Sequence, residues 1–243
     1  MKLTHKLCGA VLLGAVGVAL AIPNTTKAAD PDSKTGDMDI QFTRKTSGSV
    51  DIPNSEMSGS MSLSVDYKEF GVVAVTPLSF GEQQATATSR SYWAKNWTQS
   101  TGSSANFVAI SDERAVADHR YTVAAQITKP LTSGSSVLAG STVTLRNIHL
   151  QTQANIGDNV KLPAGAIVEP GSDRVVTNGE STLIINNTTP GAGIGTTTIT
   201  FGHLNSADEK DSSKSVKLDI GKDDLIVEGD YRGEITWTMT EVK

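Results

Sequence analysis

Residues 229–243 read GDYRGEITWTMTEVK, and this stretch decides the fold class. From Tyr231 to Met239 every second residue is apolar or glycine, and the residues between them are charged residues and threonines. Alternation with a period of two is the pattern of a half-buried β-strand. Trp237 belongs to the apolar set, so we expect its side chain to face the core while the threonines face solvent. Truncating a buried tryptophan costs about 3–5 kcal/mol, which makes Trp237 first of all a residue that closes the fold.

The rest of the chain also consists of short segments rich in Val, Ile and Thr, separated by turn residues. No long stretch beyond residue 29 keeps the apolar spacing of an amphipathic helix. The sequence therefore predicts an all-β fold, an antiparallel β-sandwich of the immunoglobulin-like type. We expect strands at residues 38–43, 71–82, 106–111, 121–127, 141–153, 166–170, 181–187, 196–204 and 215–220, as well as the final one.

Two of these segments differ in their alternation. In residues 215–220 the apolar side chains alternate cleanly with polar ones. In residues 141–153, the apolar residues Val143 and Leu145 are at odd positions, whereas Ile148 and Leu150 are at even positions. A bulge or bend near Asn147 accounts for the change of face.

The N-terminus has the pattern of a secretory signal peptide. Lys2 and Lys6 precede an apolar run over residues 7–22, and small residues follow. The run is shorter than the roughly 20 residues that a membrane span needs, so a membrane anchor is the weaker interpretation. We predict cleavage after Ala28, with a cut after Ala21 as the alternative.

This assignment divides the chain into a signal peptide over 1–28, an N-terminal segment over 29–60 and a β domain over 61–243. The single cysteine, Cys8, lies in the signal, so we expect the exported chain to fold without a disulfide and to depend on its core. Cleavage removes three lysines and no acid, which takes the formal charge from −5 to −8.

The charge and the motifs argue against nucleic-acid binding and against catalysis. A negative net charge lacks the basic face that nucleic acid requires. The glycine-rich residues 191–195 lead into a predicted strand, not a helix, so we interpret them as a hairpin loop instead of a nucleotide site. No nucleophile motif or convergent set of catalytic groups is evident, and we expect neither an enzyme nor a cofactor.

Three histidines lie outside the signal: His119, His149 and His203. None has a neighbour at metal-ligand spacing, so we expect packed or solvated roles and no metal site. The acidic residues 219–224 do not have the spacing of a calcium loop and are predicted to form a turn.

An aromatic cluster, SYWAKNW at residues 91–97, places Tyr92, Trp93 and Trp97 close together in sequence. In a strand Tyr92 and Trp93 would face opposite sides, so at least one is expected at an edge or exposed. Exposed aromatic rings can stack on sugar rings. Packing into the core is the alternative.

Five segments together resemble the WxL family of cell-surface proteins of low-GC Gram-positive bacteria. They are Phe80–Gly81, the FVAISDER run at 107–114, Tyr121–Val123, Tyr231 and Trp237–Met239. The chain departs from the family in the first motif, where Tyr and Val replace Trp and Leu. It also has Met in place of the final Leu and lacks the terminal Pro. The replacements keep apolar bulk, so we expect the fold to survive them.

The resemblance implies a secreted protein held noncovalently at the cell wall, with peptidoglycan or another wall glycan as ligand. It also implies membership of surface complexes with other WxL proteins and a membrane-anchored WxL-interacting protein. A protein–protein module of that kind and a host-matrix adhesin are the alternatives. The residues predicted to carry the motif or to contact the wall, partly through exposed aromatics, are Trp237, Met239, Tyr121, Val123, Trp93 and Trp97.

Overall fold

The computed structural model describes residues 40, 55–59, 68–86, 90–153, 157 and 159–242. The chain divides into two units, Met1–Phe42 and Thr43–Lys243, and the fold described below is that of the second unit. The predicted signal peptide and the predicted strand at 38–43 lie outside the described residues, apart from Ile40, which is exposed and not in a strand. No helix in the described part of the chain is long and apolar enough to cross a bilayer.

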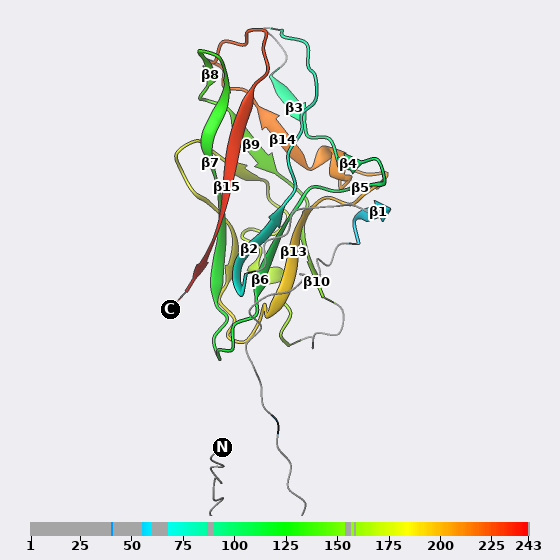
Figure 1. Ribbon diagram of the computed structural model, residues 1–243, viewed down its shortest axis with the longest axis vertical. Helices are drawn as coiled ribbons and strands as arrows, with labels where there is room; N and C mark the ends of the chain where they lie inside the picture. Colours follow the sequence, from blue (N-terminus) through cyan, green and yellow to red (C-terminus); the bar gives the residue numbers. More distant parts are fainter. Residues whose placement is uncertain are drawn as a thin grey trace, which may run out of the picture. The chain divides into compact units, whose positions relative to one another are not determined.

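The described residues form an all-β structure in which every strand pair is antiparallel (Figure 1). The only helices among them are two 3-10 turns, η1 (Ala164–Ala166) and η2 (Ser212–Lys214). The prediction of an all-β antiparallel protein is therefore confirmed.

The first sheet has its most deeply buried strands at its centre. Its order is β10 (Ile148–Thr152), β13 (Gly195–Phe201), β6 (Phe107–Asp112) and β2 (Phe70–Val75). Every residue of β6 and of β13 is buried. Both faces of the two central strands are thus covered by other parts of the protein.

Two further sheets complete the main core. One has the order β11 (Arg174–Val176), β9 (Thr142–Leu145), β14 (Val216–Asp219) and β3 (Ser91–Trp93). The other has the order β12 (Thr182–Asn187), β7 (Tyr121–Ser133) and β15 (Arg232–Glu241), with β8 (Ser136–Leu138) paired to the end of β7. The long strands β7 and β15 run side by side in Figure 1.

A small fourth sheet covers the outer face of the first. It has the order β1 (Met57–Gly59), β5 (Gly102–Ser104) and β4 (Trp97–Gln99). Trp97 on β4 meets Phe107 on β6 edge to face, with ring centroids 6.5 Å apart. Met57 packs against the same cluster. This cluster is separate from the main core, which the other three sheets share.

The two-layer immunoglobulin-like sandwich is not the arrangement that the strand pairing shows. The strands form four separate sheets, of which three share the main core and the small fourth packs on the outer face of the first. This is closer to a propeller-like ring of small sheets than to two stacked layers. The physical reason is local: consecutive strands turn from one sheet into another. Asn147 has a positive φ of 51° between β9 and β10, which belong to different sheets. The predicted bend near Asn147 is thus present, and it moves the chain between sheets.

Residues 191–194 of the glycine-rich stretch are a loop, as predicted, and Gly195 begins β13, but the loop does not close a hairpin. It joins β12 to β13, which lie in different sheets. Another prediction was wrong: residues 166–170 form the end of η1 and one isolated bridge, Ile167 to Ile185, instead of a strand. By contrast, β14 shows the predicted alternation, with Val216 and Leu218 buried and Lys217 and Asp219 partly exposed.

Candidate functional site

The last strand presents a half-buried apolar face and an exposed threonine face. Ile235, Trp237 and Met239 pack against the main core, and the threonines between them are exposed. The indole of Trp237 lies on the ring of Phe201, with centroids 6.0 Å apart and planes inclined by 29°. Because β15 is the outer strand of its sheet, its aromatic face reaches the surface instead of being covered on all sides.

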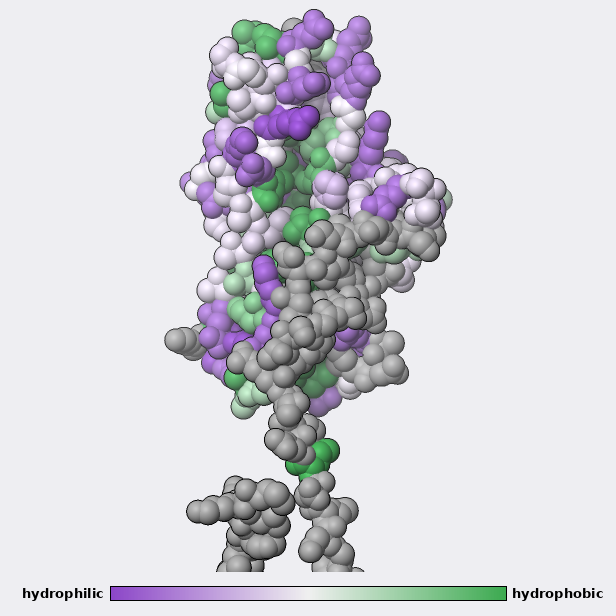
Figure 2. Space-filling model, in the orientation of Figure 1, coloured by the Kyte–Doolittle hydropathy of each residue, from purple (hydrophilic) through white to green (hydrophobic). Residues whose placement is uncertain are grey.

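An open groove runs along this face, with a cavity volume of about 1610 Å³. Trp237, Ile235 and Tyr231 line one side, and the segment 75–85 lines another. Tyr92 and residues 226–230 contribute to the rest of the lining. Figure 2 shows apolar side chains at the floor of a recess in this face, with hydrophilic residues on both sides of it.

Hydrogen bonds hold the groove's two loops in place. The hydroxyl of Tyr231 donates to the Val227 carbonyl at 3.2 Å and lies 2.9 Å from the Ser136 hydroxyl, which ties residues 226–231 to β8. On the other loop, the Lys95 amide donates to the Ser79 carbonyl at 2.7 Å. Phe80 in this loop packs against the core. The walls are therefore positioned before any ligand arrives.

The groove's charged residues are few and mixed. Four are acids and two are bases, and Lys129 pairs with Glu234 at 3.3 Å with both side chains largely exposed. The six are Glu82, Lys129, Glu228, Asp230, Arg232 and Glu234. A groove with both acidic and basic side chains does not favour a polyanion as ligand. Its aromatic side chains suit a neutral ligand with apolar faces.

The predicted motif residues lie next to one another but differ in exposure. Strand β7 carries the first motif and pairs with β15, with Val123 opposite Met239. Tyr121 and Val123 are 1% and 0% exposed, so they pack the core and offer no surface to a polymer. Met239 also packs against the core, whereas Trp237 lines the groove.

The aromatic cluster divides as its alternation predicted. Trp93 on the edge strand β3 is 38% exposed, and the Arg146 guanidinium lies over its ring at 5.7 Å. Tyr92 points the other way, into the groove, although it was not among the predicted site residues. Trp97 packs on Phe107. Neither Trp93 nor Trp97 lines the groove. The sequence could have indicated Tyr92, because in a strand its side chain faces away from that of Trp93.

A buried charge cluster joins the FVAISDER segment to the last strand. Asp112 is fully buried and accepts two hydrogen bonds from the Arg114 guanidinium, each 2.8 Å long, and a third from the Arg114 backbone amide at 3.3 Å. Arg114 also donates to Glu241 at 2.6 Å and lies 4.1 Å over the ring of Phe70. The guanidinium's hydrogen bonds with Asp112 raise the pKa of Arg114 above its ordinary value. The cluster fastens β6 to the end of β15.

The structure also brings two of the histidines together, which the spacing in sequence did not predict. His149 and His203 stack at a centroid distance of 4.4 Å, and Glu56 contacts both of them. His119 is instead buried beside Asp112.

A family model described as WxL domain surface cell wall-binding matches residues 37–242 of the chain. A search of curated proteins found no match, and neither did a search of solved structures. The matched region includes β7 and β15, the groove and the buried charge cluster.

Proposed function

Because the chain belongs to the WxL family of surface cell wall-binding domains, we propose that it attaches noncovalently to the Gram-positive wall by binding peptidoglycan in the aromatic groove. The family is one of wall-binding domains and not of enzymes, and it supports a cell-surface protein associated with the wall. The predicted signal peptide over residues 1–28 would direct export.

The observation that carries the proposal is the open groove along the last strand, with Trp237, Tyr231 and Tyr92 in its lining. Its volume of about 1610 Å³ exceeds the roughly 300–1,000 Å³ of a typical small-molecule site. A groove of this size suits a polymer segment better than a single small molecule. Aromatic rings supply flat apolar faces for sugar rings.

A substitution at the rim tests the groove without disturbing the core. Val227 lines the groove and is 40% exposed, so Val227→Arg should fill it with a long charged side chain and leave folding intact. The matched control is Val175→Arg, since Val175 is 45% exposed and lies on β11, away from the groove. We expect Val227→Arg to weaken binding to purified peptidoglycan, stripped of protein and teichoic acid, by at least about tenfold. Equal binding by both variants would refute the groove as the site.

A second candidate function follows from the position of β15 at the edge of its sheet. An outer strand can accept a further strand from a partner protein. The partner would be a membrane-anchored WxL-interacting protein, and the wall association would then depend on that complex. Stripped sacculi distinguish the two: binding without added protein supports the groove, whereas binding only with a partner supports the complex.

Host-matrix adhesion and assembly with other WxL proteins stay predictions from the family resemblance. In the part of the chain that the structure describes, Trp93 is an exposed aromatic side chain outside the groove that could serve such contacts. Comparing Trp93→Ala with wild type in a matrix-protein binding assay separates this surface from the groove.

A further inference from the structure

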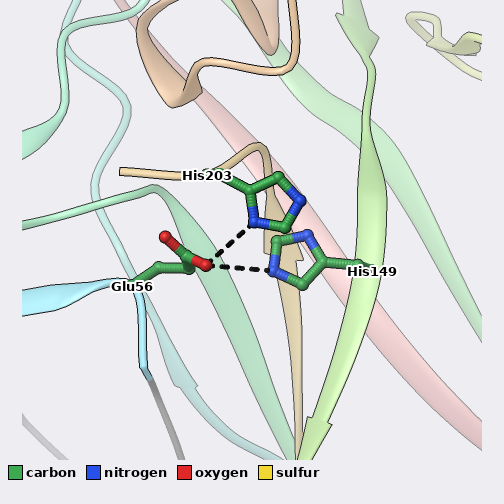
Figure 3. Close-up of side chains that lie close together, drawn as sticks. All are labelled: Glu56, His149 and His203. Carbon is green, nitrogen blue, oxygen red and sulfur yellow. Dashed lines mark hydrogen bonds and ion pairs between the residues drawn. The ribbon is translucent and has the colours of Figure 1, made fainter. Parts of the chain in front are cut away.

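The contact between Glu56, His149 and His203 joins three segments that are far apart in sequence (Figure 3). Glu56 directly precedes β1, His149 lies on β10, and His203 follows β13 by two residues. One ligand atom from each residue lies within 4.8 Å of the other two. In Figure 3 both imidazole rings turn a nitrogen toward the same carboxylate oxygen.

The separations suit a metal ion bound among the three side chains. Glu56 Oε1 lies 2.9 Å from His203 Nδ1 and 3.8 Å from His149 Nε2. Ligands of a tetrahedral zinc ion, bound at about 2.0–2.2 Å, stand roughly 3.4 Å apart. The 2.9 Å and 3.8 Å separations lie on either side of this value, and the His203 side chain, which is 46% exposed, has room to adjust its own distance to the ion.

The neighbours of His149 favour the tautomer that can bind a metal through Nε2. Its Nδ1 lies 3.3 Å from the Asn147 carbonyl oxygen, which can only accept, so Nδ1 carries the proton and Nε2 carries the lone pair. The side-chain amide of Gln151 donates to that lone pair at 3.2 Å, so this hydrogen bond has to break when Nε2 binds a metal. A hydrogen bond from the second ring nitrogen to a carbonyl is the usual way in which proteins orient a ligating histidine.

The carboxylate is also held in place. Glu56 accepts from the backbone amide of Leu204 through its second oxygen, and its own carbonyl accepts from the Ala105 amide at 3.0 Å. His203 is fixed through its backbone, which donates to the Lys210 carbonyl at 2.7 Å.

We propose that Glu56, His149 and His203 form a binding site for a divalent metal ion of the zinc class. Two imidazoles and one carboxylate favour zinc and its neighbours in the transition series over calcium or magnesium, which prefer all-oxygen ligands. The fourth position faces solvent through the exposed His203 side and takes water. On coordination, the proton between His203 Nδ1 and Glu56 moves by exchange to the exposed Nε2, and Nδ1 binds the metal. The ion would then pin the chain before β1 to β10 and to the loop after β13.

Titration calorimetry with Zn²⁺ tests the site on the purified full chain, with Cys8→Ser in every sample so that the lone thiol does not compete. We expect one Zn²⁺ per chain, a thermal unfolding temperature that rises with Zn²⁺, and loss of both effects on adding a chelator. Co²⁺ in place of Zn²⁺ should give the visible absorption of a tetrahedral ion.

Variants assign the binding to these residues. His203→Gln keeps a hydrogen-bond donor for Glu56 at an exposed position, and it should weaken Zn²⁺ binding by about a hundredfold or more. Glu56→Gln should do the same, whereas Glu180→Gln, an exposed acid elsewhere, should bind like wild type. Unfolding in the absence of metal shows whether each variant is folded. Binding that is absent in the parent chain, or unchanged in both site variants, overturns the proposal. Because no wall polymer is present, the outcome is independent of the groove.

Discussion

Asp112 is a carboxylate without exposed surface, and Arg114 is the residue that makes its burial tolerable. A buried ion pair adds little net stability, because desolvation offsets the attraction. Removing one partner is different, since it leaves the other charge buried and uncompensated. The same guanidinium reaches Glu241 and the ring of Phe70, so its loss would also loosen the end of β15.

We therefore expect Arg114→Ala to reduce the free energy of unfolding by about 3–5 kcal/mol, measured by urea denaturation. Arg120→Ala is the control, because Arg120 forms a similar two-point contact with Asp118 at the surface. Exposed pairs contribute little, so the control should unfold nearly like wild type. Similar losses in both variants would show that burial of Asp112 is not the cause.

Gly193 shows why the loop before β13 needs a glycine at this position. Its φ is +80°, and a β-carbon at this position would lie 2.6 Å from the Tyr121 hydroxyl. That hydroxyl also donates to the Gly193 carbonyl at 3.3 Å. The glycine is therefore required for packing against the tyrosine of the first motif, and not for binding a phosphate.

Among the elements, β13 is unusual because its buried side chains are mostly threonines. The hydroxyl of Thr198 has no hydrogen-bond partner among the described residues, and the residue is 0% exposed. The threonines at 196, 197 and 200 are in the same situation. A buried unpaired hydroxyl costs free energy that a methyl group of similar size would not.

We expect Thr198→Val to leave the free energy of unfolding unchanged or to raise it by up to about 1 kcal/mol. The control is Thr238→Val on β15. Thr238 is exposed, so its hydroxyl is not buried and the substitution should not raise the free energy of unfolding. Urea denaturation of both variants gives the comparison. A loss above about 1 kcal/mol in Thr198→Val alone would mean that the hydroxyl is satisfied by a bound water.

Alternation in the sequence predicted the longer strands well, and the reason is their length. Strands β7, β13 and β15 have seven or more residues, enough to show a period of two or a continuous apolar or threonine run. The strands of three residues were not predicted, because three residues carry no measurable period. They are β1, β3, β4, β5, β8 and β11.

The sequence patterns could not predict which strands pair. They also could not predict part of the candidate site. Pairing depends on turns such as Asn147, which redirect the chain between sheets. Trp237 was predicted from its parity on β15. The groove also needs the loops at 75–85 and 226–231, and the cluster of Glu56, His149 and His203 needs three distant segments to meet. Such proximity leaves no local trace in the order of residues.

For the whole molecule, the net charge of −5 limits which wall polymer can be the main ligand. Teichoic acids are also anionic, so long-range electrostatics oppose association with them. The groove contributes to this balance with four acids and two bases. Contacts with neutral glycan in the groove should depend instead on apolar burial and short hydrogen bonds, which salt hardly screens.

We expect binding to purified peptidoglycan to change by less than about twofold as the ionic strength rises from about 0.1 M to about 1 M, where the Debye length falls from about 10 Å to about 3 Å. Walls that retain teichoic acid should behave differently: binding should be weaker at low salt and should rise as salt screens the repulsion between the two polyanions. Co-sedimentation of the protein with the two wall preparations measures both trends. Binding to bare peptidoglycan that disappears at modest salt would mean that charge, and not the aromatic groove, holds the protein to the wall.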